Sequence, residues 1–312
     1  MQQISPMNTS RRAFIKHTSI AVAGLTIFSE QLFASNVGKK RPLVGMQLYS
    51  VRDEMKQDPL GTLQQLSRMG YKHLEHASYN NRKFYGYTAK EFKKILNDLG
   101  FTMPSGHTVF HAKHWDKTSN DFTSEWKYTI EDAATLEQKF VISPSMDVRN
   151  KSYDDVLQFL DLFNKSGELC KQSGMKFGYH NHAFEFTTKL NNQTLFDIIL
   201  QNTDPGLVMQ QLDTGNMYSV GGRAPEIYKK YPGRFPSLHV KEVMKIDKEG
   251  NGEKYESTVL NKGVIGMKKV LTLAKTIGGT EDFIIEQEDY QGQKPLDVMN
   301  ENLATMKKWG YK

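Results

Sequence analysis

Short apolar segments typical of β-strands alternate eight times with segments typical of amphipathic helices, from residue 41 to the C-terminus. The helical segments carry apolar residues three and four positions apart, and several of them end at a glycine. The pattern predicts strands at 43–50, 71–78, 101–107, 139–145, 175–182, 207–216, 235–243 and 282–289. Few folds use such a long and regular alternation, so the repeat constrains the architecture more than any other feature.

Eight strand–helix units without an evident linker predict an α/β protein in which 41–312 form one domain, a single (β/α)8 TIM barrel. A doubly wound parallel sheet alternates in the same way. The 312 residues would also suffice for two smaller domains. The positions of the polar residues favour the barrel, as described below.

Composition excludes some classes of function. The formal charge is +6, from 41 basic and 35 acidic residues, and no basic block is interleaved with aromatic residues. Nucleic acid is therefore not an expected partner. Cys170 is the only cysteine, which excludes an intramolecular disulfide and a cysteine-based zinc site. We expect this thiol to be buried and inert.

The N-terminal segment resembles an export signal. Arg11 and Arg12 stand in an S-R-R-x-F-I-K arrangement, an apolar stretch follows at 19–28, and small residues occupy 34–35. The stretch is shorter than the ~20 apolar residues that span a bilayer. We predict a twin-arginine signal peptide at 1–35, a periplasmic or otherwise exported protein, and no stable membrane anchor after cleavage. A buried amphipathic helix is the alternative.

Polar and ionisable side chains recur at the C-terminal ends of the predicted strands. They are Gln47, Tyr49, Glu75, His76, His107, Tyr179, His180, His182, Asp213, His239, Lys241, Glu286 and Glu288. Any one of them could be an ordinary polar residue at a strand edge. Their recurrence in nearly every unit favours a barrel, because a barrel places all of these ends around one mouth, where active sites are built.

Four of these residues form a candidate metal site. Asp213, His239 and Glu286 lie on three successive strands, and His180 lies on the strand before them. Carboxylate and imidazole ligands suit one divalent ion, Mn²⁺, Co²⁺, Fe²⁺, Ni²⁺ or Zn²⁺, and the lack of thiolate leaves its identity open. Such an ion can polarise a carbonyl and make the adjacent C–H more acidic, while a neighbouring side chain moves the proton.

Five motifs carry a family resemblance: GMQLYSVRDEM, YHNHAFEF, LDTGN, LHVKE and FIIEQED. In this order they resemble the sugar phosphate isomerase/epimerase superfamily, the xylose isomerase-like barrels, over essentially the whole mature chain. The resemblance implies a divalent metal held by Glu, Asp, His and Glu on strands five to eight. Asp213, His239 and Glu286 match the last three positions, and Glu286 would also serve as a catalytic acid or base.

The first position departs from that pattern, since the sequence has His180 where many relatives have glutamate. The resemblance implies that the two glutamates exchange the proton, so another residue must replace the missing one. His182, Lys241, Glu75 and His107 are the candidates. His182 is also a rival to His180 as the strand-five ligand.

The sequence therefore predicts a metal-dependent enzyme, similar to sugar isomerases and epimerases, that abstracts a proton next to a carbonyl. Export and the lack of a glycine-rich phosphate cradle favour an unphosphorylated sugar, keto-sugar or glycoside as substrate. The alternatives are a keto-sugar lyase or dehydratase, a non-catalytic periplasmic sugar-binding protein and, ranked last, phosphodiester cleavage as in endonuclease IV-type barrels. The sequence leaves a homo-oligomer open.

Overall fold

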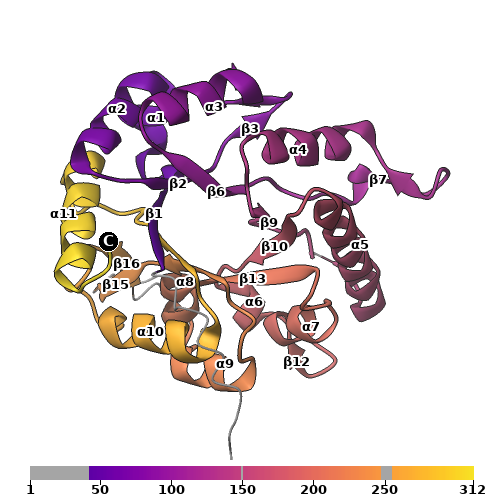
Figure 1. Ribbon diagram of the computed structural model, residues 1–312. Helices are drawn as coiled ribbons and strands as arrows, with labels where there is room; N and C mark the ends of the chain where they lie inside the picture. The colour runs from indigo at the N-terminus through magenta and orange to yellow at the C-terminus, as the bar shows by residue number, and fades with distance from the viewer. Residues whose placement is uncertain (1–41, 149, 247–254) are drawn as a thin grey trace, which may run out of the picture. The chain divides into compact units, whose positions relative to one another are not determined.

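Eight parallel strands close into a barrel, and helices surround it (Figure 1). The computed structural model describes residues 42–148, 150–246 and 255–312. Around the barrel the strands are β1 (Leu43–Gln47), β2 (His73–His76), β6 (Thr102–His107), β9 (Phe140–Ser143), β10 (Lys176–His180), β13 (Val208–Asp213), β14 (Ser237–Val240) and β17 (Asp282–Ile285). The closure of β17 on β1 confirms the predicted (β/α)8 fold and excludes the doubly wound sheet.

The larger helices form the outer layer. They are α1 (Arg52–Gln57), α2 (Pro59–Met69), α3 (Ala89–Asp98), α4 (Ser124–Thr135), α5 (Tyr153–Gln172), α7 (Leu195–Gln201), α9 (Ala224–Lys230), α10 (Met267–Leu273) and α11 (Pro295–Lys308). Local signals set their ends. Thr88 and Glu91 form a reciprocal capping box at the start of α3, and α2 ends at Gly70 with a left-handed φ of 97°.

Two large apolar clusters pack the helices against the barrel. One includes Leu66, Phe92 and Met299, and the other includes Trp126 and Phe163. Cys170 belongs to the second cluster and is buried, as predicted. The barrel strands also bury a polar set, Gln47, Glu75, Ser105, Gln211, Ser237 and His239. Buried polar groups require partners, so this set indicates a hydrogen-bonded network.

Several predicted strands were too long at their C-terminal ends. β1 ends at Gln47 because its side chain accepts a hydrogen bond from the backbone N–H of Tyr49 and starts the short helix η1 (Leu48–Val51). β13 ends at Asp213 for the same reason, since its carboxylate caps α8 (Thr214–Ser219). These side chains therefore act as helix caps.

The shorter strands change the position of several candidate residues. β10 ends at His180, β14 at Val240 and β17 at Ile285, so His182 and Glu288 lie in loops. Alternation with period two ends with the strand, so it does not place His182 on the face of His180 or Glu288 on the face of Glu286.

Small hairpins in the loops were missed because each strand is very short. They are β3 (Tyr79–Asn80), β4 (Lys83–Phe84) and β5 (Tyr87–Thr88); β7 (Trp115–Asp116) and β8 (Asp121–Phe122); and β11 (Lys189–Leu190) and β12 (Gln193–Thr194). The polar stretch at 244–261 contains most of another ribbon, β15 (Glu242–Lys245) with β16 (Tyr255–Thr258). Three shorter helices, α6 (Phe184–Thr187), η2 (Ala112–His114) and the π-helix η3 (Ala274–Gly278), complete the described chain.

The predicted signal peptide at 1–35 lies outside the described residues, so it stays a prediction. Within the ranges that the structure describes, no helix combines the length and the apolar character needed to cross a membrane.

Candidate metal centre and active site

Four predicted ligands converge at the C-terminal end of the barrel. His180 ends β10, Asp213 ends β13, His239 lies in β14, and Glu286 directly follows β17. These four strands are neighbours in the barrel, and Asp213 pairs in register with His239. One potential ligand atom from each residue lies within 4.8 Å of the others, and all four residues are buried. The barrel therefore brings two imidazoles and two carboxylates to one point.

The carboxylate of Asp213 tests whether this set suits a cation. Its Oδ1 accepts a hydrogen bond from the Asn216 N–H at 2.7 Å. Its Oδ2 is buried without a hydrogen-bond partner, 3.9 Å from His180 Nε2 and 3.8 Å from His239 Nδ1. Burial, with the charge of Glu286, raises the pKa of Asp213 to about 7. A buried oxygen without a hydrogen bond costs about 1–3 kcal/mol. Because Oδ2 lacks one and contacts Lys241 only as an ion pair at 3.6 Å, the donor set fits a divalent metal ion.

The group of His180, Asp213, His239 and Glu286 is called the metal-type cluster below. Glu75 lies beside this cluster and contacts His239. It is fully buried, and its carboxylate accepts hydrogen bonds from Gln47, Ser105, Gln211 and His239. The bond from His239 Nε2 is 2.6 Å long, while Nδ1 of the same ring lies 3.1 Å from Glu286 Oε2. Burial opposes the charge of Glu75, but His107 and His239 outweigh it and hold its pKa well below the usual value. Glu75 thus orients a ligand histidine from outside the ligand set.

Gln211 determines which nitrogen of two histidines carries the proton. Its Nε2 donates to Glu75 and Ser237, so its Oε1 can only accept. That oxygen lies 2.9 Å from His180 Nδ1 and 2.8 Å from His107 Nε2, and both nitrogens must therefore donate. Burial, with the nearby His239, lowers the pKa of His180 well below its usual value. His180 is then a neutral imidazole with a free lone pair on Nε2, the form that binds metals.

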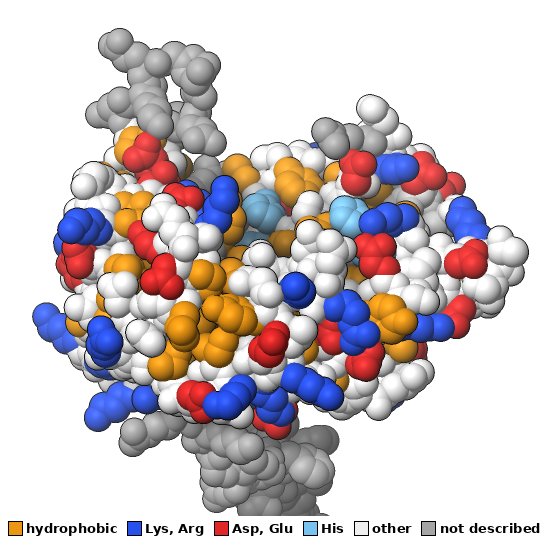
Figure 2. Space-filling view, turned by 90° about the horizontal axis from the view of Figure 1, so that it is seen from above, with side chains coloured by type: hydrophobic (Ala, Val, Ile, Leu, Met, Phe, Trp, Pro, Cys, Tyr) orange, Lys and Arg blue, Asp and Glu red, His pale blue; other side chains and the backbone are white. Residues whose placement is uncertain are grey.

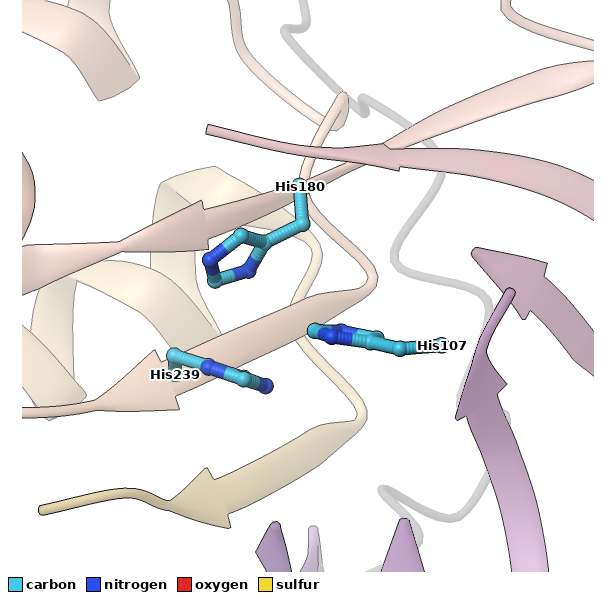
Figure 3. Close-up of side chains that lie close together, drawn as sticks. All are labelled: His107, His180 and His239. Atoms are coloured by element: carbon cyan, nitrogen blue, oxygen red, sulfur yellow. The ribbon is translucent and has the colours of Figure 1, made fainter. Parts of the chain in front are cut away.

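Three histidines lie together in the close-up view (Figure 3). The rings of His107 and His239 are nearly parallel with centroids 5.2 Å apart, and the His180 ring lies 4.5 Å from that of His239. These three residues form a second possible metal-binding group. However, the Nε2 atoms of His107 and His239 both contact Glu75, so the set with Asp213 has more free donor atoms.

Lys241 connects the cluster to the loop after β17. Its ammonium lies 3.2 Å from Glu286 Oε2 and 3.6 Å from Asp213 Oδ2, and it is hydrogen-bonded to Glu288. Burial opposes this charge, but the three carboxylates outweigh it and raise the pKa of Lys241 well above its usual value. Gly215 makes room for this side chain, since a Cβ there would lie 2.8 Å from Lys241 Cγ. Lys241 is therefore a fixed cation at the edge of the cluster.

His182 lies beside the cluster but outside the four-residue group. Its backbone N–H donates to Glu185 Oε2 at 2.7 Å, and Glu185 also accepts from the Tyr179 hydroxyl. Its Nδ1 is buried without a hydrogen-bond partner, and burial, with the charge of Lys241, lowers its pKa to about 4. The geometry thus groups His180 with the other three ligands and leaves His182 as a neutral imidazole nearby.

A cavity of about 950 Å³ opens above the cluster. In the space-filling view, histidine side chains show at a hollow in the surface (Figure 2). Of the residues predicted from the sequence, Tyr49, His107, His180, His182, Lys241, Glu286 and Glu288 line the cavity. Glu75, Asp213 and His239 are fully buried and are not part of its lining. The predicted residues therefore form two layers, one that can contact a ligand and one that supports it.

Sequence reasoning missed Gln211, which joins the two layers. A signal for it was present, because Gln211 stands two residues before Asp213 in the buried strand MQQLD and shares its face. Arg82 and Tyr128, which also line the cavity, carried no comparable signal.

Comparison with known proteins agrees with this fold. The profile of the family described as "Xylose isomerase-like TIM barrel" matches residues 63–309. Because the match covers most of the sequence, the chain belongs to this family. A sugar phosphate isomerase/epimerase from Parabacteroides distasonis superimposes with a TM-score of 0.71 at 26% identity, covering 88% of this chain and 96% of that one.

Two further relatives show the range of the family. An inosose dehydratase from Bacillus cereus is 29% identical over 168 residues, which is 49% of this chain and 55% of that enzyme. The chain thus spans about half the length of this curated relative. The IOLI protein, whose structure contains a zinc atom, shares the fold with a TM-score of 0.66 at 13% identity, covering 86% of this chain and 99% of that one.

Proposed function

We propose that the protein is a divalent-metal-dependent enzyme that acts on an unphosphorylated sugar, keto-sugar or glycoside by abstracting a proton next to a carbonyl. The observation that carries the proposal is the buried group of His180, Asp213, His239 and Glu286, in which Asp213 Oδ2 has no hydrogen-bond partner. This group adjoins a large cavity with ionisable side chains. The names of the relatives, isomerases or epimerases and dehydratases, support the same chemistry.

The residues of the proposed site would have different roles in this reaction. A divalent ion held by the four ligands would polarise the substrate carbonyl. Lys241 stays charged between its carboxylates and can donate a hydrogen bond to the oxygen that becomes negative. His107 keeps a free Nδ1, since its Nε2 donates to Gln211. His182, a neutral imidazole, is therefore the first candidate to accept a proton from the substrate, and Nδ1 of His107 is the second.

Glu286 and Glu75 take different roles in this proposal. Glu286 adjoins both the cavity and His239, so it can bind the ion and exchange a proton. Both carboxylate oxygens of Glu75 already accept hydrogen bonds, and Glu75 is not part of the cavity lining. We therefore assign it to positioning His239 rather than to proton transfer.

Isomerisation or epimerisation is the leading outcome, and β-elimination by a keto-sugar lyase or dehydratase is the second. The second is favoured by the presence of His180 in the sequence at the position where the family resemblance implies the first member of a glutamate pair. A sugar-binding protein without catalysis is the remaining alternative. All three take a small carbohydrate as partner.

Product analysis in D₂O separates these outcomes. Purified protein would be incubated with a panel of keto-sugars, with and without EDTA, and the products analysed by NMR and mass spectrometry. Deuterium incorporation without loss of mass supports isomerisation or epimerisation, and loss of water or an alcohol supports elimination. His182→Ala and His107→Ala would each be compared with the wild type to identify the base. Turnover that persists unchanged in EDTA would contradict the metal-dependent mechanism.

We also propose export through the twin-arginine route, on the basis of Arg11 and Arg12. Cell fractionation would test this proposal with the double variant Arg11→Lys, Arg12→Lys. The wild type is expected in the periplasmic fraction and the variant in the cytoplasm. Equal distribution of the two proteins would contradict it.

A further inference from the structure

The cavity is larger than a single sugar ring at the metal cluster requires. Its volume of about 950 Å³ lies near the upper end of the range for drug-sized ligands. Arg82, Lys113, Glu125 and Tyr128 also line it. In the described residues, none of these four side chains forms a hydrogen bond or an ion pair with the metal-type cluster. A ligand that contacts only the cluster would leave them unused.

The part of this wall around Arg82 is held firmly. Arg82 has a left-handed φ of 61° in the turn between β3 and β4, a conformation that costs a non-glycine residue about 1–3 kcal/mol. Its Nη2 and Nε bind the two oxygens of Asp132 at 2.7 and 3.0 Å. Asp132 is buried on α4 and also accepts from the Tyr79 hydroxyl at 2.8 Å. The bidentate pair therefore fixes the β3–β4 hairpin to α4.

Arg82 and Tyr128 form an exposed platform on this wall. The guanidinium carbon lies 4.2 Å from the centre of the Tyr128 ring. The Arg82 side chain is 44% exposed and Tyr128 is 43% exposed. In the described part of the chain, Arg82 Nη1 makes no hydrogen bond, so it can donate to a ligand. An aromatic ring next to a free N–H suits a sugar ring, which has an apolar face and hydroxyl oxygens.

The charges on the wall are already paired. Arg82 is neutralised by Asp132 and Glu131, and Lys113 lies 3.1 Å from Glu125. A phosphate group would need cations free to meet it. The wall therefore suits a neutral polyhydroxyl ring better than a phosphorylated one.

From the cavity, its fixed wall and its paired charges, we infer that Arg82 and Tyr128 form a distal subsite for a second sugar ring. The substrate is then a disaccharide or a larger glycoside whose reacting ring lies at the metal cluster. This inference rests on the proposed function and specifies its substrate class.

Binding of matched ligands tests the subsite. Isothermal titration calorimetry on the metal-loaded protein would compare three pairs: methyl β-glucoside with cellobiose, methyl α-glucoside with maltose, and methyl β-galactoside with lactose. At least one two-ring ligand is expected to bind ten times more tightly than its one-ring partner. Tyr128→Ala should remove this tenfold advantage and leave one-ring binding unchanged, whereas Tyr128→Phe should keep it.

Tyr218→Ala is the matched control, because Tyr218 also packs against an arginine, Arg223, with 4.0 Å between guanidinium carbon and ring centre, and is not part of the cavity lining. It should keep the two-ring advantage. If one-ring ligands bind and no two-ring ligand binds more tightly, the distal subsite is wrong and the proposed function stands. An equal loss for both ligand types in Tyr128→Ala would also overturn the subsite. Protein that holds no metal and binds no sugar would overturn the proposed function itself.

Discussion

Gln211 shows how one buried amide can prepare two histidines for their roles. It fixes the proton on His180 Nδ1 and on His107 Nε2, while its own orientation is fixed by Glu75 and Ser237. Residues that support metal ligands in this way usually contribute strongly to metal affinity. The metal-type cluster therefore depends on a side chain that is not itself a ligand.

We expect Gln211→Leu to weaken metal binding by about 10- to 100-fold, because His180 and His107 lose their acceptor and Glu75 loses a donor. Chelator competition with Zn²⁺ or Co²⁺ would measure the change. Gln210→Leu is the control, since Gln210 is also buried but its amide donates only to a backbone oxygen. Equal affinities of the two variants would contradict the assigned role.

The candidate metal ligands could be predicted from the sequence because they lie at the ends of successive strands. His180, Asp213, His239 and Glu286 were predicted as one set, and the structure places them together. Contacts across the barrel could not be predicted, because they depend on how the strands tilt and close. The bond between Glu75 on β2 and His239 on β14 is an example, since the partners are 164 positions apart in the sequence.

At the scale of elements, the packing of α5 against the loop before β13 is unusually close. Gly167 lies inside this helix, and a Cβ there would meet Leu207 Cβ at 2.7 Å and its backbone oxygen at 2.8 Å. Helix propensity alone favours alanine over glycine by about 1 kcal/mol. The close contact with Leu207 opposes this preference for alanine, since the backbone atoms of Leu207 cannot easily move away from an added Cβ.

We therefore expect Gly167→Ala to destabilise the protein by about 1–3 kcal/mol, despite its better helix propensity. Urea unfolding followed by circular dichroism would measure the change. Glu168→Ala, at the next and exposed position, should change the free energy of unfolding by less than about 0.5 kcal/mol. A Gly167→Ala protein as stable as the wild type would show that the helix can shift away from Leu207.

At the scale of the whole molecule, the proposed site and a destabilising buried carboxylate lie at opposite ends of the barrel. The cavity and the metal-type cluster occupy the C-terminal end, whereas Asp282 lies at the start of β17. Both oxygens of Asp282 are buried without a hydrogen-bond partner, and Lys139 Nζ is 3.7 Å from Oδ1. Burial raises the pKa of Asp282 to about 6, and Lys139 offsets only part of this effect.

This pKa predicts a pH dependence of stability. The folded state holds the Asp282 proton more tightly than the unfolded state does. The contribution of the protonated Asp282 carboxyl to the free energy of unfolding is therefore full below about pH 4 and is lost as the pH rises to about 6. Asp282→Asn should thus be more stable than the wild type by about 2 kcal/mol at pH 8, and the difference should vanish near pH 4. Thermal unfolding across this range would test it, and a difference that does not change with pH would contradict it.

The overall architecture was predictable because eight strand–helix units leave few ways to close a sheet. The loop hairpins were not, since strands of two residues have no period to detect. The Asn81–Arg82 turn is a case in point, because its left-handed backbone is accompanied by a contact between Arg82 and Asp132 on a helix distant in sequence. The sequence thus predicted the barrel and its metal-type cluster but not the far wall of the cavity.

Metal content is the most direct test of the central claim. Inductively coupled plasma mass spectrometry on the purified wild type should find about one divalent ion per chain, and Asp213→Ala and His239→Ala should each lose it. Asp282→Asn, at the opposite end of the barrel, should retain it. A wild type that is free of metal and still converts a sugar in the presence of a chelator would contradict the account.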